Sequence, residues 1–292
     1  MQNSNIANMS HNRARKRRLR RLNPLRVRRP RVRGLSFNRL IPNILTMLGL
    51  CAGLSAIRFG IENRFEEAAI ALLVAACIDG LDGRIARLLH ATSHFGAEFD
   101  SLSDFVCFGV APSLLLFLWT LQWEGGRYGF IPCILFTVCM ALRLARFNAS
   151  LADDDKPAYS ANYFTGVPAP AGALIVLFPL FMGLEARRIQ SEWLFTCAHQ
   201  PLLSAIMLVM TAALLVSTTP VWSFKNFRIP SRHILPIMLG TVLYATFLIS
   251  DPWAALALAA LVYLLMIPFS RQSFKKLKRE AEALSEEVET II

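Results

Sequence analysis

The stretch that decides the fold runs from Asp79 to Asp104 and reads DGLDGRIARLLHATSHFGAEFDSLSD. It begins at the end of an uncharged run of eleven residues, 68–78. A helix that spans a bilayer needs roughly 20 mostly apolar residues, so a crossing helix here must also contain Asp79 and Asp82. The apolar segment that follows the stretch has Asp100 and Asp104 at its start. Both helices therefore carry carboxylates at membrane depth, where ionisable groups are costly and usually functional.

The spacing of these acids predicts that they converge. Asp79 and Asp82 are three residues apart, and Asp100 and Asp104 are four apart, so each pair lies on one face of a helix. A short polar turn joins the two helices, which makes them antiparallel neighbours. Four converging carboxylates repel one another unless cations lie between them, and Mg²⁺ characteristically binds through a few carboxylates plus substrate phosphates. The pattern predicts a divalent-cation site, with Arg87 nearby to hold a phosphate or pair with a carboxylate.

A simpler interpretation is that these acids are solvated ends of helices beside an ordinary loop. The string D-x2-D-G-x2-A-R-x8-G-x3-D-x3-D contains eight defined positions within a membrane chain, which argues against that interpretation. The string resembles the signature of the CDP-alcohol phosphotransferase family. The matching positions are Asp79, Asp82, Gly83, Ala86, Arg87, Gly96, Asp100 and Asp104.

The composition indicates a polytopic membrane protein rather than a soluble domain. The chain has 292 residues, of which 54% are hydrophobic and 17% charged. The net charge of +11 is concentrated near the N-terminus, because thirteen of the 31 Lys and Arg lie within residues 13–39. No aromatic residue lies between Arg13 and Arg33, so we expect this basic arm to contact anionic lipid and set orientation rather than bind nucleic acid.

Hydrophobic periodicity predicts eight membrane spans and an all-α fold. The runs lie at about 40–58, 67–89, 97–121, 129–148, 168–184, 200–218, 233–250 and 253–269. Loops rich in Lys and Arg fall on the side of the carboxylates and of both termini, and the positive-inside rule assigns that side to the cytoplasm. The expected domains are a basic disordered arm at 1–36, a membrane-embedded catalytic domain at 37–270 and an amphipathic cytoplasmic tail at 271–292.

The first hydrophobic run opens with Ile41-Pro-Asn-Ile-Leu-Thr46, which predicts a helix start with Pro42 in its first turn. Asn43 and Thr46 share one helical face. Helix capping and interhelical hydrogen bonding would explain them, but Pro-Asn-x-x-Thr before the acidic stretch also resembles the opening helix of the family, which lines the nucleotide site. The resemblance implies a nucleotide and pyrophosphate site made of Asn43, Thr46, Asp82, Gly83, Ala86, Arg87 and Gly96.

Three later stretches narrow the resemblance. They are Arg143-Leu-Ala-Arg-Phe-Asn148, Phe164-Thr-Gly-Val-Pro-Ala-Pro-Ala171 and Ser217-Thr-Thr-Pro-Val-Trp-Ser-Phe-Lys225. In this order they resemble the bacterial branch of the family that forms phosphatidylserine. The resemblance covers roughly residues 37–270 and implies a six-helix catalytic core with about two further transmembrane helices. It also implies a homodimer in the bacterial inner membrane, with membrane lipids as neighbours.

The chemistry that the resemblance implies is transfer of the phosphatidyl group from CDP-diacylglycerol to L-serine, giving phosphatidylserine and CMP. Two Mg²⁺ or Mn²⁺ ions would be held by Asp79, Asp82, Asp100 and Asp104, and Asp104 would also act as general base on the serine hydroxyl. The carboxylate of serine requires a cation. The acceptor-site candidates are Arg143, Arg146, Asn148, Lys225 and Arg228, and the sequence does not choose among them.

Two other classes of function remain open at this point. An enzyme of the same family could use glycerol phosphate, inositol or choline as acceptor. A cation transporter could use the acidic cluster as an ion path, although no matching acids lie deeper in other spans and no inverted repeat is evident. A purely structural membrane anchor gives no reason for four buried acids.

Overall fold

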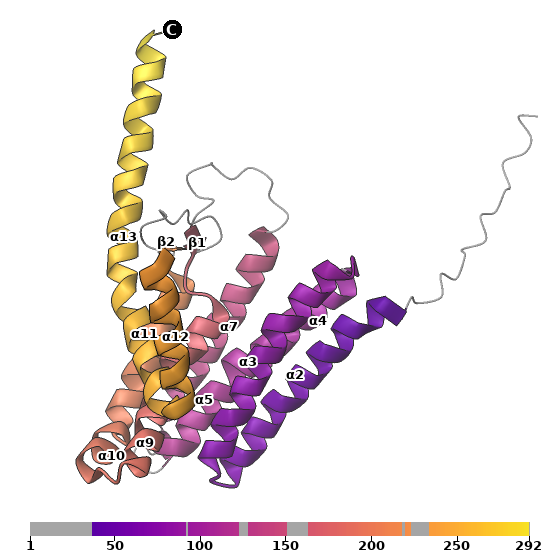
Figure 1. Ribbon diagram of the computed structural model, residues 1–292, viewed down its shortest axis with the longest axis vertical. Helices are drawn as coiled ribbons and strands as arrows, with labels where there is room; N and C mark the ends of the chain where they lie inside the picture. Colours follow the sequence, from indigo (N-terminus) through magenta and orange to yellow (C-terminus); the bar gives the residue numbers. More distant parts are fainter. Residues whose placement is uncertain are drawn as a thin grey trace, which may run out of the picture. The chain divides into compact units, whose positions relative to one another are not determined.

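The computed structural model describes residues 37–91, 93–122, 128–150, 163–217, 220–222 and 234–291. Its elements are helices, apart from two strands of three residues each that pair antiparallel (Figure 1). The N-terminal arm predicted at 1–36 lies outside the described residues, and so do Lys225 and Arg228. The all-α membrane fold predicted from the sequence is confirmed.

The first half of the chain contains the helices that carry the acidic stretch. They are α2 (Phe37–Ile61), α3 (Phe65–Leu88), α4 (His94–Asp104), the π-helix η1 (Phe105–Val110), α5 (Ala111–Leu116), the π-helix η2 (Phe117–Leu121) and α7 (Ile131–Ser150). The segments from α4 to η2 follow one another without a break and form one long helical rod. Its first turns carry Asp100 and Asp104.

The second half packs against α7 mainly through its helix α11. Its elements are β1 (Tyr163–Thr165), α8 (Ala169–Val176), α9 (Phe178–Arg188), α10 (Glu192–Ala198), α11 (Pro201–Val216), β2 (Pro220–Trp222), α12 (Ile234–Ser250) and α13 (Pro252–Ile291). In the β1–β2 pair Tyr163 lies opposite Trp222 and Thr165 opposite Pro220. This short ribbon joins the beginning of α8 to the end of α11.

A helix or a bent pair of helices occupies each of the eight predicted runs. Within the described residues, four segments are long and apolar enough to cross a membrane: Leu40–Ile61, His94–Leu121, Ile131–Ala149 and Pro252–Ser273. The bent pairs α8–α9 and α10–α11 raise that number to six. Helix α3 is not among these segments because it contains too many charged residues. Helix α12 is apolar, but its 17 residues make it slightly short for a crossing. The structure therefore has four to six candidate spans, and the count of eight stays a prediction.

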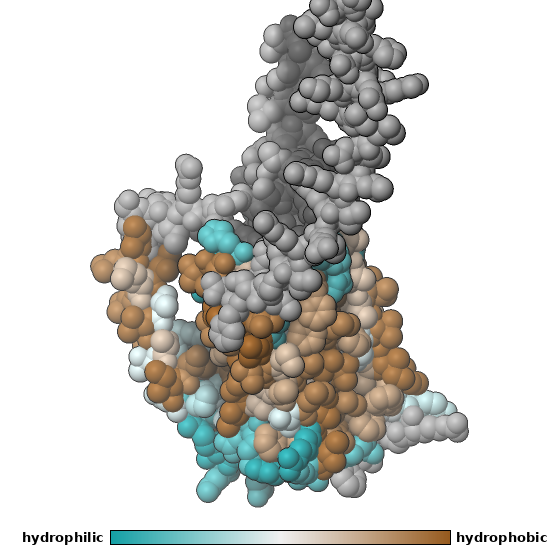
Figure 2. Space-filling model, turned by 90° about the vertical axis from the view of Figure 1, so that its right-hand side faces the viewer, coloured by the Kyte–Doolittle hydropathy of each residue, from teal (hydrophilic) through white to brown (hydrophobic). Residues whose placement is uncertain are grey.

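The surface is that of an integral membrane protein. Hydrophobic side chains form a broad band over the helices, and hydrophilic ones gather at the lower end in the view of Figure 2. Helix α12 has no buried residue, and Leu235 and Ile249 on it are 78% and 84% exposed. A water-soluble monomer rarely exposes contiguous apolar surface of this kind, whereas lipid covers it without cost.

Prolines explain where the helices break, with one correction to the prediction. Helices α8 and α9 meet at 46° just before Pro179, and α10 and α11 meet at 46° just before Pro201. Pro42, however, is not in the first turn, because α2 already starts at Phe37. A proline in the second turn removes a single backbone hydrogen bond near the helix end, which α2 tolerates.

The described residues of the predicted C-terminal tail continue the helix of the last span. Helix α13 continues from Pro252 to Ile291 and includes Pro268, so the last span and the tail form one element. The segment after residue 270 is rich in Lys, Arg, Glu, Ala and Leu, which are good helix formers, and nothing in it terminates a helix.

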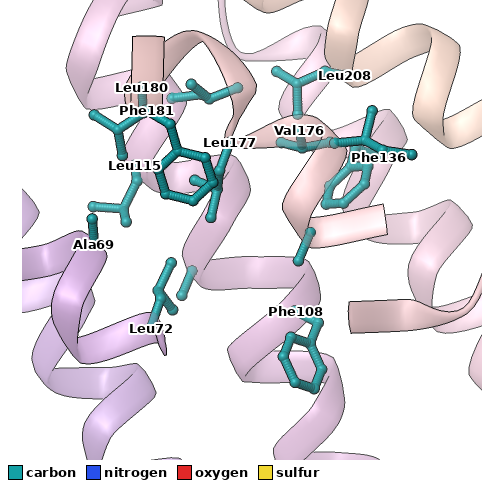
Figure 3. Packing of buried hydrophobic residues seen from close by; sticks show 14 of the residues in the cluster. Ala69, Leu72, Phe108, Leu115, Phe136, Val176, Leu177, Leu180, Phe181 and Leu208 are labelled. Carbon is teal, nitrogen blue, oxygen red and sulfur yellow. The ribbon is translucent and has the colours of Figure 1, made fainter. Parts of the chain in front are cut away.

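Buried apolar side chains from both halves hold the bundle together. Leu115, Phe136, Leu180 and Leu208 are fully buried and come from α5, α7, α9 and α11 (Figure 3). Closer to the acidic stretch, weak polar contacts join α2 to the α4–η1 rod. The Ser103 hydroxyl lies 3.5 Å from the Thr46 carbonyl oxygen, and the Cys107 thiol donates to the carbonyl of Gly49 at 3.6 Å. These contacts bring the polar face of α2 beside the carboxylates.

Candidate active site

Three carboxylates from two helices form a compact cluster. One oxygen each from Asp79, Asp82 and Asp100 lies within 4.8 Å of the other two. Asp79 and Asp82 project from one face of α3, and Asp100 reaches them from α4 after the turn that reverses the chain. Asp82 is 4% exposed, and Oδ1 of Asp100 is buried without a hydrogen-bond partner among the described residues. The convergence expected from the spacing is therefore what the structure has for these three residues.

Asp104 is not one of these three clustered carboxylates, but it lies next to Asp79. Its carboxyl group is within hydrogen-bonding reach of Asp79, and its Oδ1 is buried with no partner in the described part of the chain. Asp79, Asp82 and Asp104 line a small cavity together with Thr46 and Ser103. Two carboxyl groups in contact require a shared proton or a cation, so the fourth acid belongs to the same charged centre.

The donor set fits a hard divalent cation. None of these four carboxylates forms an ion pair with a Lys or Arg of the described residues. Clustered carboxylate oxygens that form no ion pair with these side chains suit Mg²⁺ or Mn²⁺, which prefer oxygen ligands and share them with phosphates. Thr46 fixes one of the oxygens: its hydroxyl donates to Oδ2 of Asp82 at 2.7 Å, with the carbonyl of Pro42 at 3.1 Å as a second acceptor.

A pocket with an empty volume of about 620 Å³ opens beside the cluster. All seven residues of the predicted nucleotide and pyrophosphate site line it: Asn43, Thr46, Asp82, Gly83, Ala86, Arg87 and Gly96. Asp100 lines it as well, so the carboxylate cluster forms one wall. The Arg87 side chain donates from Nε to the carbonyl of Gly83 at 3.1 Å, which leaves its two terminal amino groups available at the pocket.

The absence of a side chain at Gly96 shapes this pocket. The Ser93 hydroxyl caps α4 by accepting a hydrogen bond from the Gly96 amide at 3.0 Å. A Cβ at position 96 would lie 2.9 Å from Oδ1 of Asn43 and 3.0 Å from Oγ of Ser93. The glycine therefore lets the Asn43 amide approach the first turn of α4, where the two helices frame the pocket.

A Gly96→Ala variant tests this arrangement. We expect it to fold, because alanine is favoured over glycine within a helix. The added methyl group displaces the Asn43 amide, and soluble CDP should bind about tenfold more weakly, as for the loss of one hydrogen bond to a charged ligand. Gly80→Ala is the matched control, since a Cβ there meets nothing within 4 Å. Unchanged CDP affinity, measured by titration calorimetry, would remove Asn43 from the site.

The structure separates the acceptor-site candidates that the sequence left together. Arg143 is half-buried on α7, faces Asp104 and Tyr263, and stacks over Phe147 with 5.5 Å between its guanidinium carbon and the ring centroid. Arg146 uses its guanidinium group within the protein, because it donates hydrogen bonds to the carbonyl oxygens at the end of α11. The distances are 2.9 Å to Val216, 3.1 Å to Leu215 and 3.4 Å to Ser217.

Asn148 also makes contacts within the protein. Its Nδ2 donates to the hydroxyl of Ser101 at 2.9 Å, and that hydroxyl lies 3.3 Å from Oδ1 of Asn148. Ser101 follows Asp100 directly, so this side-chain pair ties the end of α7 to the part of α4 that carries the acids. Lys225 and Arg228 lie outside the described residues.

The three later sequence stretches meet at one place. Gly166 has φ of +83°, a conformation that glycine adopts readily, and a Cβ there would lie 3.0 Å from the carbonyl oxygens of Leu215 and Ser217 and 3.3 Å from the Arg146 guanidinium. The turn before α8 therefore packs closely against the end of α11 and against Arg146, which is hydrogen-bonded to that end. The sequence did not indicate that Ser101 and Tyr263 belong near the site. Ser101 is hydrogen-bonded to Asn148 and Tyr263 lies near Arg143, and both of these partners are distant along the chain.

Comparison with known proteins gives a consistent result. The family model described as CDP-alcohol phosphatidyltransferase matches residues 39–217, and a second model, CDP-alcohol phosphatidyltransferase 2, matches residues 232–268. The chain is 38% identical over 263 residues to a CDP-diacylglycerol–serine O-phosphatidyltransferase of Mycobacterium leprae, covering 87% of this chain and 82% of that protein.

Proteins of the same name from other organisms are also similar. The Helicobacter pylori protein is 31% identical over 226 residues, which cover 77% of this chain and 88% of its own. The Saccharomyces cerevisiae protein is 35% identical over 142 residues, or 46% of this chain and 50% of its own. The family match spans the carboxylate cluster, the adjoining pocket and Arg146. The chain belongs to the CDP-alcohol phosphatidyltransferase family.

Proposed function

We propose that this protein transfers the phosphatidyl group of CDP-diacylglycerol to L-serine, releasing phosphatidylserine and CMP. The observation that carries the proposal is the cluster of Asp79, Asp82 and Asp100, two of which, Asp82 and Asp100, line the pocket beside Asn43 and Arg87. A nucleotide diphosphate ester placed there presents its phosphates to the cluster. The activity named for the relatives supplies the donor and acceptor.

Side chains of this protein bind and orient the donor in this proposal. Arg87 offers two free amino groups to a phosphate, and Asn43 and Gly96 frame the opening of the pocket. Thr46 keeps Asp82 in one orientation through the 2.7 Å hydrogen bond. The cluster would hold Mg²⁺ or Mn²⁺, and a bound divalent ion supplies positive charge that stabilises the phosphates as charge develops on the leaving CMP.

Asp104 serves as the general base in this proposal. It contacts Asp79, is not one of the three clustered carboxylates, does not line the nucleotide pocket, and has Arg143 nearby. A serine bound here places its hydroxyl beside Asp104 and its carboxylate beside Arg143. Asp104 then accepts the hydroxyl proton as the serine oxygen attacks the phosphorus atom next to diacylglycerol.

The proposal includes the setting of the enzyme. The carboxylates lie at the end of the bundle that the positive-inside rule assigns to the cytoplasm, where a cytidine nucleotide and serine are available. We place the protein in the cytoplasmic membrane of a bacterium, surrounded by lipid and acting as a homodimer.

The decisive experiment is an acceptor panel. Purified protein in detergent receives CDP-diacylglycerol, Mg²⁺ or Mn²⁺, and one radiolabelled alcohol at a time: serine, glycerol phosphate, inositol or choline. We expect label in lipid with serine only, and with release of CMP. Incorporation of another alcohol in preference to serine would assign the enzyme to a different acceptor within the same family.

The two arginines of α7 should respond differently to replacement. We expect Arg143→Gln to raise the KM for serine by about 10–100-fold, the range for a charged hydrogen bond, with little change in donor affinity. Arg146→Gln should instead lower the melting temperature, because the carbonyls that end α11 lose their donor. Initial rates and thermal unfolding distinguish the variants. A larger KM increase in Arg146→Gln at unchanged melting temperature would exchange the two roles.

A further inference from the structure

A separate pocket lies at the end of the bundle opposite the carboxylates. It has an empty volume of about 890 Å³, and residues from the beginnings of α3 and α13 and from the end of α9 line it. Phe65, the first residue of α3, precedes Asp79 by 14 residues, which is about 20 Å of helix. Hydrophilic side chains gather at this end, where α9 and α10 lie (Figures 1 and 2). The pocket is therefore distinct from the nucleotide site.

Three arginines line this pocket, and they differ in their partners. Within the described part of the chain, the Arg187 side chain has neither an ion pair nor a hydrogen bond, although it is exposed. The other two arginines are paired with acids: Arg64 with Glu62 and Glu67, and Arg188 with Glu185 and Asp251. One cation of this pocket is thus left for a ligand.

Aromatic rings hold the guanidinium group of Arg187. Its carbon atom lies 4.8 Å from the ring centroid of Trp119 and 5.0 Å from that of Phe195. Trp119 is 1% exposed and packs edge-on against Phe65, so this platform belongs to the core. A guanidinium that stacks on rings through its face keeps the N–H groups of its edge for acceptors, and their fork matches two oxygens of a phosphate.

The surface around the pocket is one that lipid covers. Ile70 and Val74, one and two helical turns beyond the pocket on α3, are 47% and 45% exposed and form an apolar stripe. Trp193 and Tyr128, at the same end of the bundle, are 75% and 73% exposed, and such rings are typical of the level of lipid headgroups. The stripe therefore leads from the headgroup level into the bilayer.

We infer that this pocket binds the phosphodiester of a membrane phospholipid in the leaflet opposite the carboxylates, with Arg187 as its cation. One unpaired guanidinium matches the single negative charge of a phosphodiester. Glu66 and Glu67 also line the pocket, and like charges repel, so the more highly charged inorganic phosphate is disfavoured. The apolar stripe contacts the hydrocarbon part, which a soluble anion lacks. This inference goes beyond the proposed function and does not depend on it.

Titration of the protein in detergent with dioctanoyl phosphatidylglycerol tests the inference, with excess CDP and Mg²⁺ present to fill the nucleotide pocket. We expect Arg187→Gln to raise the Kd of this lipid about 10–100-fold, the range for a charged hydrogen bond. Dioctanoylglycerol, which has no phosphate, and inorganic phosphate should each bind at least about tenfold more weakly than the lipid. Arg58→Gln is the matched control, because it removes the same charge at the same end, outside the pocket. Its Kd should equal that of the wild type.

An unchanged Kd in Arg187→Gln, or an equal loss in Arg58→Gln, would overturn the inference. Inorganic phosphate that binds as tightly as the lipid would assign the pocket to a soluble anion and overturn it as well. Crosslinking of the wild-type protein does not depend on the folding of a variant. Phosphatidylglycerol with a diazirine in its headgroup should label residues 63–67 and 184–188. Labelling confined to α4, beside the nucleotide pocket, would contradict the inference.

Discussion

Replacing Asp79 or Asp100 by asparagine is expected to reduce turnover by about 10³-fold or more. Asparagine nearly keeps the shape of aspartate but removes the negative charge that the cluster offers to a divalent ion. A metal ion at a phosphoryl centre contributes several kcal/mol, and each 1.36 kcal/mol is a factor of ten in rate. Asp79 belongs to the group of three carboxylates and also contacts Asp104, so its loss affects the whole charged centre.

Three measurements define this result. Titration calorimetry should show that CDP binding to the variants no longer depends on Mg²⁺ or Mn²⁺. The wild-type protein stripped with excess EDTA should lose activity and regain it when a divalent ion is restored. Glu66→Gln is the control, because Glu66 is an exposed acid on the same helix and far along it from the cluster. Full wild-type turnover after the metal has been stripped would refute the metal assignment.

Asp104→Asn should lower turnover by about 10²–10⁴, the usual contribution of a general base, while affinity for the donor falls much less than in Asp79→Asn. The difference follows from geometry. Asp79, Asp82 and Asp100 remain within 4.8 Å of one another when Asp104 is replaced, so the donor keeps its partners. The serine hydroxyl, in contrast, loses the group that accepts its proton.

Titration calorimetry with CDP-diacylglycerol, run beside initial-rate assays, separates the two roles. Ser101→Ala provides a control on the same face of α4, since it weakens the contact to Asn148 without removing an acid. We expect only a modest rate effect in that variant. Equal loss of donor binding in Asp104→Asn and Asp79→Asn would make Asp104 chiefly a metal ligand, and another residue would have to serve as base.

The donor half of the site could be predicted from the sequence because its information is local. Spacings of three and four residues place Asp79 with Asp82 and Asp100 with Asp104 on single helical faces, whatever the rest of the chain does. The turn between the helices then brings the pairs together, as the cluster shows for three of the four acids. Pro42 misled the prediction of the helix start, since proline is tolerated one turn further in than expected.

The acceptor side could not be resolved in the same way, because its contacts join distant segments. Nothing near Arg146 in the sequence indicates that its guanidinium ends on the carbonyls of Leu215 and Val216. Charge alone made Arg143 and Arg146 equivalent, and only tertiary packing distinguishes them. The bends at Pro179 and Pro201 have a local cause, but their 46° angles depend on how the helices pack.

The separation between these two kinds of contact has a consequence for the order of assembly during synthesis. The residues of the carboxylate cluster and of the adjoining pocket lie within 42–104, so a growing chain contains all of them early. The remaining chain takes roughly 10–40 s to emerge at about 5–20 residues per second. The cluster and the pocket can thus form from short-range contacts before the later segments leave the ribosome. Those segments contain Tyr263, which lies near Arg143, and the end of α11, which binds Arg146. Slow late folding would therefore concern the acceptor side alone.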